Sequence, residues 1–562
     1  METTGDEANP IIWMGLCVIS VCLSFFLQWN TGIIPLDGSH DSLRYLEMAQ
    51  SLTDGKWLGD YDQMTLIRSP VYPGYMAFNG IMGLALQHAQ TFAYLLSVVL
   101  LSFSLRTIGV ESHRVAIVCI VCAFHPGAWI PCRFVATEGL YTSAVTLVLA
   151  SAIGVMGTMR KSDFSSVFWI MVLSVSLSAA WRTRDESLWL VPASVVFVAL
   201  MIRELVVMQR GGVNSRQMIV PVAAMVLPCL SVYCLTVWIQ HRNFRHYGVA
   251  VVNELVEPGF VSAFSWLTRI DGETHHPYIP ITRQAMSDAS RISLHFERLY
   301  PYLAQQLDGK GWSQFGCQMM GICDELAGGW AVWAVRDAAS AVGVHAGAVH
   351  AAAFYADLAG EIEAGCRTGS IACSANPTGN MLAPPMKGID IPRIILSVPK
   401  VIWMTLWVAD LPEAYRLIAD KEPSAELFAR YRPLVGKITD RQSTMIVKFQ
   451  YMLSWGYRAI HVIGVLYMLI IAVLNGLQRT QRGIVKKMKR YRCNYYGIIA
   501  LIVVFISSRI AIISYIDAMS YLAQSRYMIV IYPSLITLIC FVSPVRCSKY
   551  DGSPNALVSD IV

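Results

Sequence analysis

The chain has 562 residues, of which 55% are hydrophobic and 15% charged, and its mean hydropathy is +0.47. Soluble domains carry about 25% charged residues, so this composition excludes an ordinary soluble enzyme, a disordered chain, a coiled coil and a disulfide-stapled secreted domain. The formal net charge of +6 is too small to indicate nucleic-acid binding and has to be interpreted by location.

Runs of about 20 apolar residues with few charges predict membrane-spanning helices. Two neighbouring apolar pieces, 71–87 and 91–105, are expected to make one net crossing, because the polar residues that flank them favour opposite faces. With that crossing, seven spans are expected before the longest polar region and three after it, which predicts an all-α polytopic membrane protein of about ten spans. The other expected spans are 11–29, 115–132, 139–159, 164–181, 187–202, 217–240, 460–477, 495–516 and 522–542.

Basic residues in short loops mark the cytoplasmic face of a membrane protein. The clearest mark is the segment 479–492, with seven basic residues and no acidic one, and Arg546 and Lys549 place the C-terminus on the same face. The segments that then lie outside are 37–70, the residues before Glu138, 182–186 and 242–395. Because the chain also lacks an Asn-x-Ser/Thr sequon with a non-proline middle residue, we expect an integral protein of the bacterial inner (plasma) membrane whose active site faces the periplasm.

The longest outer segment is long enough to fold as a small extracytoplasmic domain. We therefore expect an N-terminal transmembrane catalytic module at 1–240, an extracytoplasmic domain at 241–395 and a C-terminal transmembrane module at 396–562. Residues 331–364 are rich in alanine but carry charged side chains, so they are not expected to span. The stretch 391–411, which two prolines and a lysine interrupt, is expected to lie on the membrane or to re-enter it.

Four of the 14 cysteines fall in the outer segment: Cys317, Cys323, Cys366 and Cys373. An even number of cysteines in an oxidising compartment predicts two disulfides, with three connectivities left open. Free buried thiols are the alternative. The Cys119-x-x-Cys122 pair has no second pair to complete a metal site, so no metal is predicted there.

The first outer loop carries a group of polar residues on one helical face. Asp41, Arg44, Tyr45 and Met48 follow the spacing i, i+3, i+4, i+7. The Asp41 carboxylate can cap the helix, or it can act as a base or hold a metal beside Arg44 and Tyr45. His40 adds a further candidate ligand.

A second acidic residue opens the uncharged stretch 139–159 from the outside. Thr137-Glu138 stands where a helix dipole favours a negative charge, so a purely structural role is one interpretation. The other is functional, since Glu138 and Asp41 are expected to face the same compartment. Two carboxylates there can divide the roles of general base and positioning group.

Arginines occur at the outer ends of later spans. Arg184 belongs to a charged turn that could neutralise itself, and Arg509 lies inside an apolar run, where a charge is costly and indicates function. Arg526 opens the last span, so it and Arg509 approach the same leaflet with Asp517 between them. The two arginines pair with Asp517, snorkel toward the membrane interface or bind a phosphate, for which a guanidinium is suited.

Taken together, these segments resemble the GT-C-fold glycosyltransferases, most closely the branch of dolichyl-phosphate-mannose protein mannosyltransferases and aminoarabinose transferases. The resemblance rests on the pattern Asp41-x-x-Arg44-Tyr45, on a Gly-x-Trp-Leu step at 55–58 and on the proline-bearing segment 68–74. Further on, Thr137-Glu138 is similar to the second acidic site of that branch, Arg184 to its Thr-Arg step, and Arg526-Tyr527 to its late Arg-Tyr step. The resemblance covers residues 10–210 well and 495–545 loosely.

The resemblance implies a GT-C-like bundle that moves a sugar, with inversion, from a polyprenyl phosphate to an acceptor hydroxyl on the outer face. In such a protein Asp41 would accept the hydroxyl proton, and Glu138 would be the second acid at the acceptor or metal position. The residues implied to hold the donor phosphate are Arg526, Arg184 and Arg509, and those implied to line the substrates are Tyr45, Arg44, Tyr527 and His40.

The implied partners are the lipid-linked sugar, membrane lipids and a glycan, lipid or protein acceptor. No cofactor is required, and a divalent cation is allowed, although Ser42 stands where many members have a second acid beside the first. A glycolipid transporter or flippase is one alternative, and a non-catalytic membrane scaffold is another. Both are disfavoured because the charges lie at outer helix ends and no internal repeat is present.

Overall fold

The structure is a computed structural model that describes residues 10–29, 31–34, 42–160, 163–213, 215–256, 258–271, 276–375, 383–408, 430–437, 444–481 and 495–541. In these ranges the chain is helical, and its only β-type pairings are two isolated bridges. The all-α architecture expected from the composition is confirmed. Two predicted site residues, His40 and Asp41, lie outside the described ranges, as does most of the basic segment 479–492.

Eight helices among the described residues are long and apolar enough to cross a membrane. They are α1 (Pro10–Gln28), α4 (Leu86–Thr107), α7 (Thr137–Thr158), α8 (Phe164–Thr183), α9 (Val191–Arg210) with the 3₁₀ helix η2 (Asp185–Leu190) before it, α10 (Ser215–Tyr247), α21 (Thr444–Gln481) and α22 (Tyr495–Met519). The polytopic character expected from the sequence is therefore confirmed by length and composition.

The expected total of ten spans is reached only if two irregular elements are counted. The first is a pair of helices, α5 (Ser112–Ala123) and the segment Pro126–Arg133 that begins with α6 (Pro126–Trp129), which meet at a bend of 46°. The second is the short apolar segment Ser525–Phe541, made of the 3₁₀ helix η5 (Ser525–Ile531) and α23 (Tyr532–Phe541). Proline at the start of α6 removes a backbone donor, which explains why the span breaks there.

The region between residues 71 and 106 forms one short and one long helix. α3 (Val71–Ile81) has only 11 residues, too few to cross, whereas α4 is one of the eight candidate spans. One crossing there is what the alternation of polar loops requires.

α7 lies at the centre of the bundle and is the most buried of the eight candidate spans. Small residues permit this, because a Cβ at Gly154 would overlap the Trp169 ring of α8 and a Cβ at Gly157 would overlap Thr107 of α4. Glycine at such positions lets neighbouring helix backbones approach closely in membranes. These contacts hold the last turns of α7 against α8 and α4, while Glu138 lies in the first turn at the opposite end.

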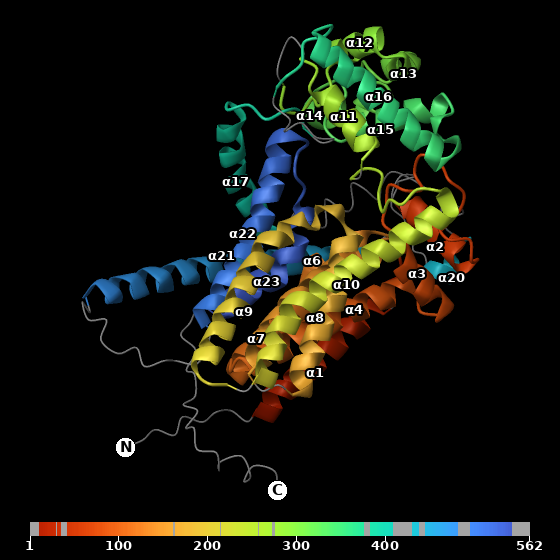
Figure 1. Cartoon of the computed structure of the whole chain (residues 1–562). Helices are drawn as coiled ribbons and strands as arrows, with labels where there is room; N and C mark the ends of the chain where they lie inside the picture. The colour runs from red at the N-terminus through yellow and green to blue at the C-terminus, as the bar shows by residue number, and fades with distance from the viewer. Residues whose placement is uncertain are drawn as a thin grey trace, which may run out of the picture.

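A second helical body caps one end of the bundle (Figure 1). It contains α11 (Phe260–Thr268), α12 (Arg283–Ile292), α13 (Leu294–Ala304), α14 (Ser313–Met320), α15 (Trp330–Ala341) and α16 (Ala348–Thr368). These helices share a core of their own, with Phe264, Phe296 and Leu358 at its centre. We call this body the cap and the adjoining end of the bundle the cap side. The alanine-rich stretch 331–364, which was not expected to span, forms α15 and α16.

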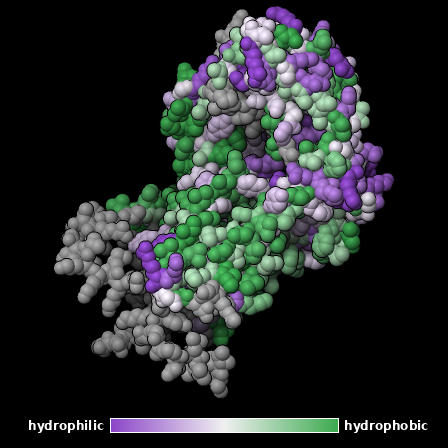
Figure 2. Space-filling view, in the orientation of Figure 1, coloured by the Kyte–Doolittle hydropathy of each residue, from purple (hydrophilic) through white to green (hydrophobic). Residues whose placement is uncertain are grey.

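Buried polar contacts fix the cap to the bundle's loops. The fully buried Arg336 of α15 donates to the Gln63 carbonyl at 2.6 and 2.9 Å and pairs with Glu254 at 2.6 Å. Figure 2 shows the corresponding division of the surface, with hydrophobic residues over the bundle and hydrophilic residues over the cap. Such an apolar belt beneath a polar cap agrees with an integral membrane protein.

The other helices border these two bodies. α2 (Ser42–Thr53) follows the first loop, α20 (Arg432–Val435) packs against α3, and α17 (Asp390–Leu406) packs along α22. α17 is the stretch expected to lie on the membrane or to re-enter it. Its outward side exposes Ile391, Ile395 and Trp403, and Figure 1 shows it beside the upper end of α22.

Candidate functional site

Five charged side chains from distant parts of the chain meet at the cap side of the bundle. They come from the start of α7, from the turn and 3₁₀ helix between α8 and α9, from α22 and from η5. Arg184 connects the two acids of the group, since its Nη1 lies 3.1 Å from Glu138 Oε1 and its Nε lies 3.1 Å from Glu186 Oε1. Together they form what we call the charged cluster: Glu138, Arg184, Glu186, Arg509 and Arg526.

The charged cluster carries more positive than negative charge. Three guanidinium groups face two carboxylates, which leaves a surplus of one positive charge if all five are ionised. Burial alone would lower the pKa of Arg184, but the carboxylates of Glu186 and Glu138 outweigh it and hold that pKa well above its usual value. The described part of the cluster is therefore rich in guanidinium groups, which suit an anionic ligand.

Glu138 does more than complement the dipole of α7. The helix begins after Ala136, whose side chain makes no capping bond, and Glu138 follows in the first turn. Its carboxylate is directed to Arg184 and lies 4.0 Å from Nη1 of Arg526. The purely structural interpretation of a helix-starting acid therefore does not describe all of its contacts.

A buried amide holds the backbone that leads into Glu138. Gln90 of α4 donates from Nε2 to the carbonyl oxygens of Cys132 at 3.0 Å and Phe134 at 3.2 Å. Its Oε1 accepts a hydrogen bond from the Tyr72 hydroxyl at 3.1 Å. Gly139 makes room for this amide, because a Cβ there would lie 2.7 Å from Gln90 Oε1.

Arg509 is directed into the protein. It donates from Nε and Nη2 to the carbonyl oxygen of Tyr527 at 3.0 and 2.7 Å, and its Nη2 lies 2.8 Å from Glu186 Oε1. Only 1% of its side chain is exposed. Arg509, which the sequence predicted to bind phosphate, thus donates to a backbone carbonyl of η5 and pairs with an acid. It is therefore suited to holding η5 in position.

Arg184 and Arg526 are the arginines of the cluster that reach solvent. Their side chains are 18% and 23% exposed, respectively. Arg184 also donates to the Thr137 hydroxyl at 3.3 Å, and the Arg526 guanidinium lies 5.3 Å from the ring centroid of Tyr527. An anion that enters the cluster from solvent meets these two side chains first.

Asp517 does not pair with either Arg509 or Arg526. Its Oδ1 accepts from Lys400 Nζ at 2.6 Å and from the Ala523 backbone N–H at 2.8 Å, and its Oδ2 accepts from the Ser397 hydroxyl at 2.7 Å. The idea that Asp517 neutralises the two arginines is therefore wrong. Both side chains on α17 were separated from Asp517 by more than a hundred residues, so local sequence patterns gave no sign of this pairing.

Arg44 and Tyr45 of the first loop are buried and engaged with neighbours. Arg44 Nη2 lies 2.6 Å from Asp62 Oδ1 and 2.5 Å from the Thr65 hydroxyl, so it holds the loop after α2. Tyr45 packs edge-on against Tyr72, with ring centroids 5.1 Å apart. Their contacts are those of residues that support the loop.

The four cysteines of the cap form two local disulfides among the described residues. Cys317 is bonded to Cys323, and Cys366 to Cys373. As to metals, no group of three or more His, Cys, Asp or Glu side chains comes together in the described ranges. A divalent cation would need Asp41, which lies outside them, in addition to Glu138.

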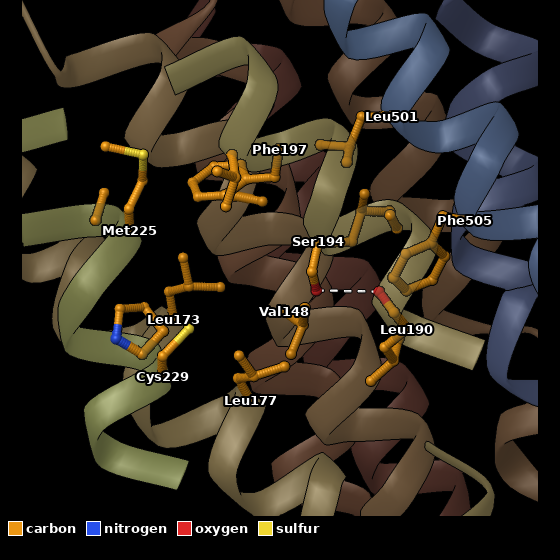
Figure 3. Close-up of a pocket in the computed structure, with 16 residues that line it drawn as sticks. Val148, Leu173, Leu177, Leu190, Ser194, Phe197, Met225, Cys229, Leu501 and Phe505 are labelled. Carbon is orange, nitrogen blue, oxygen red and sulfur yellow. Dashed lines mark hydrogen bonds between the residues drawn. The ribbon is translucent and has the colours of Figure 1, made fainter. Parts of the chain in front are cut away.

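An apolar cavity of about 60 Å³ lies between α7, α8, α9, α10 and α22 (Figure 3). Leu190 and Phe505 belong to its wall, and Figure 3 also shows the Ser194 hydroxyl donating to the Leu190 carbonyl. Trp189, next to Leu190, packs edge-on against Phe505 and lies 5.5 Å from the Arg509 guanidinium. Trp189 thus contacts both a wall residue of the cavity and a member of the charged cluster.

Sequence reasoning did not single out Glu186 and Trp189 as site residues. Glu186 contacts both Arg184 and Arg509, and Trp189 donates from Nε1 to the Tyr141 hydroxyl at 2.9 Å. A signal for Glu186 was present, since Arg184, Asp185 and Glu186 are consecutive at the start of a span. It was interpreted as a turn that neutralises itself, and the contact with Arg509, over 300 residues away, was not visible.

Comparison with known proteins adds little to the description of the site. No family model matches the chain, and no curated protein matches it. Among solved structures it is similar to the crystal structure of ArnT from Cupriavidus metallidurans in the apo state, with 12% identity, a TM-score of 0.29, and coverage of 94% of this chain and 76% of that one. That likeness is too low to carry a conclusion, so the function proposed below rests on the residues of this chain.

Proposed function

We propose that this protein is a membrane glycosyltransferase that moves a sugar from a polyprenyl-phosphate donor to an acceptor hydroxyl on the outer face of the membrane, with inversion at the sugar. The observation that carries the proposal is the charged cluster, a cationic site with two solvent-reaching arginines at the ends of apolar helices. Its position suits a ligand with a charged head and a lipid tail.

The charge of the donor changes during the reaction in a way that the cluster can stabilise. The acceptor oxygen bonds to the anomeric carbon and its proton passes to a base. The bond from that carbon to the phosphate oxygen breaks, and the oxygen keeps the electron pair. The phosphodiester thus becomes a phosphomonoester and gains a negative charge. Fixed donors such as Arg184 and Arg526 act where this charge develops, which stabilises the transition state more than the ground state.

The lipid part of the donor has an apolar place next to the cluster. Trp189 packs against Phe505, in the wall of the cavity between α7, α8, α9, α10 and α22, and its ring centroid lies 5.5 Å from the Arg509 guanidinium. A prenyl chain that leaves the phosphate could follow these helices without crossing a polar surface. This separation of a charged head from an apolar path is what a lipid-linked substrate requires.

We assign the base to Asp41 from the sequence pattern. Its neighbour Ser42 donates from its hydroxyl to the Val135 carbonyl at 2.8 Å, three residues before Glu138. This bond holds the start of α2 against the segment that leads into Glu138. In this proposal Glu138 orients the acceptor and limits the positive charge of the two arginines.

The proposal is tested with the purified full chain in detergent and a panel of polyprenyl-phosphate hexoses and pentoses. Release of polyprenyl phosphate in the presence of membrane glycan and lipid extracts is measured by mass spectrometry. We expect turnover with at least one donor, and a loss of about 10²-fold or more in Arg526→Ala, as for removal of a donor to a developing oxyanion.

Arg160→Ala is the matched control. Arg160 is also an arginine paired with a glutamate, Glu204 at 2.5 Å, but it lies at the opposite end of α7. It should leave turnover unchanged. Absence of turnover with every donor, or equal turnover in Arg526→Ala and Arg160→Ala, would contradict the proposed function. Accumulation of intact donor on the opposite leaflet of proteoliposomes would favour a flippase instead.

A further inference from the structure

Aromatic side chains form a continuous line from the cap to the charged cluster. Each ring lies close to the next, with centroid separations between 5.5 and 6.4 Å. The line ends at the residue that follows Arg526. In order from the cap, its members, which we call the aromatic row, are Trp333, Trp312, Phe315, Trp330, Tyr521 and Tyr527.

The row crosses from one body of the structure to the other at a close backbone contact. Trp330 begins α15 of the cap, and Tyr521 follows the end of α22, with ring centroids 6.4 Å apart. Gly328 permits the approach, since its φ is +51° and a Cβ there would overlap the carbonyl oxygen of Ser520. The cap is thus seated directly beside the turn that leads to Arg526.

The rings of the row lie outside the core of the cap, although Trp312 packs against that core. That core is built from residues such as Phe264, Phe296 and Leu358, whereas Trp330 and Trp333 are only half-buried and Phe315 is 36% exposed. Aromatic rings that served only to join two bodies would bury more of their surface, because the burial is what stabilises such a contact. The cap end of the row therefore offers ring faces to solvent, whereas Tyr527 at its other end is buried.

Polar groups lie along the row at intervals. The Trp312 indole N–H donates to Asp337 Oδ2 at 2.7 Å, and the Arg68 guanidinium lies 5.7 Å from the Trp333 ring centroid. Near the cluster, Gln524 Oε1 is enclosed and accepts no hydrogen bond within the described part of the chain. A ligand on this row meets both apolar faces and hydrogen-bonding groups.

We propose that the aromatic row binds the acceptor, and that the acceptor is a saccharide. A pyranose ring has C–H faces and hydroxyl edges, and the electron-rich face of an aromatic ring attracts such C–H groups. This inference rests on the proposed function, and it names the substrate class that the same site would take.

Two other acceptor classes fit the row less well. A lipid tail would be better served by the largely apolar cavity on the bundle than by rings that lie beside Asp337 and Arg68. A peptide strand would need rows of backbone donors and acceptors, and the described cap is helical, with a single isolated bridge. The row leads from the cap through Tyr521 to Tyr527, the neighbour of Arg526, where transfer takes place in the proposed function.

The experiment is a binding measurement that needs no donor. The purified full chain in detergent is applied to an array of hexose, hexosamine and uronic-acid oligosaccharides, with peptides and phospholipids as further spots. We expect binding to at least one oligosaccharide class, and at least a tenfold loss in Trp330→Ala. Trp330→Phe keeps a ring and should retain most of the binding. Trp266→Ala is the control, because Trp266 is a cap tryptophan that stacks on Arg269 away from the row.

Each outcome decides the matter. No oligosaccharide binding, binding to peptides or phospholipids only, or equal binding by Trp330→Ala and Trp266→Ala would overturn the inference. Equal melting temperatures of the variants exclude loss of fold as the cause of a difference. Turnover without glycan binding would contradict this inference alone, whereas glycan binding without turnover would contradict only the proposed transfer.

Discussion

Two ionic groups lie on the cap side, each built on a buried carboxylate, and they differ in balance. The charged cluster holds three arginines and two glutamates, and two of its arginines reach solvent. Around Asp517 a single carboxylate meets a single ammonium, with a hydroxyl and a backbone N–H filling its other acceptor positions. A balanced and saturated group holds helices together, whereas a surplus of charge at a solvent-reaching site indicates a ligand of the opposite charge.

The largest effect is expected at the proposed base beside the cluster. Asp41→Asn keeps the size of the side chain but cannot accept the hydroxyl proton, so kcat should fall by about 10³-fold, within the usual range for a general base. Turnover of polyprenyl-phosphate sugar measures it. Asp54→Asn, an exposed aspartate that accepts a hydrogen bond from Gln50, serves as the control. Full activity in Asp41→Asn would remove the assigned base.

A smaller effect on turnover is expected at Arg509, which we treat as a positioning residue. Arg509→Gln removes the two N–H donors that hold the Tyr527 carbonyl, so η5 and Arg526 should shift, and kcat should fall by about 10-fold to 100-fold. Arg509→Lys can restore one of these bonds and should recover part of the loss. The split between kcat and KM is the measurement, since loss of a phosphate ligand would raise KM for the donor in both variants.

The Asp517 group should respond in stability and not in chemistry. Asp517→Asn weakens charge-assisted hydrogen bonds to Lys400 and Ser397, which should cost about 1–2 kcal/mol of folding free energy. A lower Tm, with unchanged turnover per folded molecule, is expected in thermal unfolding and donor assays. If turnover instead fell as far as in Arg526→Ala, the distinction between the two ionic groups would fail.

The smallest expected effect is a pH dependence of the stability of the cap, which involves neither the charged cluster nor the Asp517 group. Burial, reinforced by the Asp324 carboxylate, raises the pKa of Glu325 to about 7, although the Arg283 N–H donates to it. The folded state then binds the proton more tightly than the unfolded state. The protonated Glu325 carboxyl therefore stabilises the fold fully below the ordinary carboxyl pKa, and this stabilisation is lost as the pH rises through 7.

Glu325→Gln should remove this dependence. At pH 8 the variant should have a Tm higher by roughly 1–2 °C, a small shift because water screens a half-exposed carboxylate. At pH 4 the two proteins should melt together. Thermal unfolding across this pH range is the measurement, and an equal difference at pH 4 and pH 8 would show that ionisation of Glu325 is not its cause.

The sequence predicts some parts of this molecule well, and the reasons are physical. Hydropathy alone locates helices such as α7 and α22, because a bilayer requires long apolar segments. The alternation of basic and polar loops also predicts that Glu138, Arg184 and Arg526 share one side of the bundle. The number of spans was less certain, since the break before α6 and the 3₁₀ turn of η5 depend on local backbone geometry.

Contacts between distant segments were not predictable in the same way. The carbonyl of Tyr527 occupies Arg509 only because η5 turns back toward α22, and the sequence suggested a phosphate there instead. Lys400 reaches Asp517 from α17, 117 residues away. Such pairings are set by tertiary packing, which hydrophobic periodicity and hydropathy do not reveal.

The most direct test of the central claim is the binding of polyprenyl phosphate, the lipid product, to the purified full chain. Its Kd is measured by intrinsic tryptophan fluorescence for the wild type, Arg184→Ala, Arg526→Ala and the control Arg160→Ala. If the charged cluster holds the lipid phosphate, each cluster variant should bind at least tenfold more weakly, with Arg160→Ala unchanged. Equal affinity in all four proteins would contradict the account.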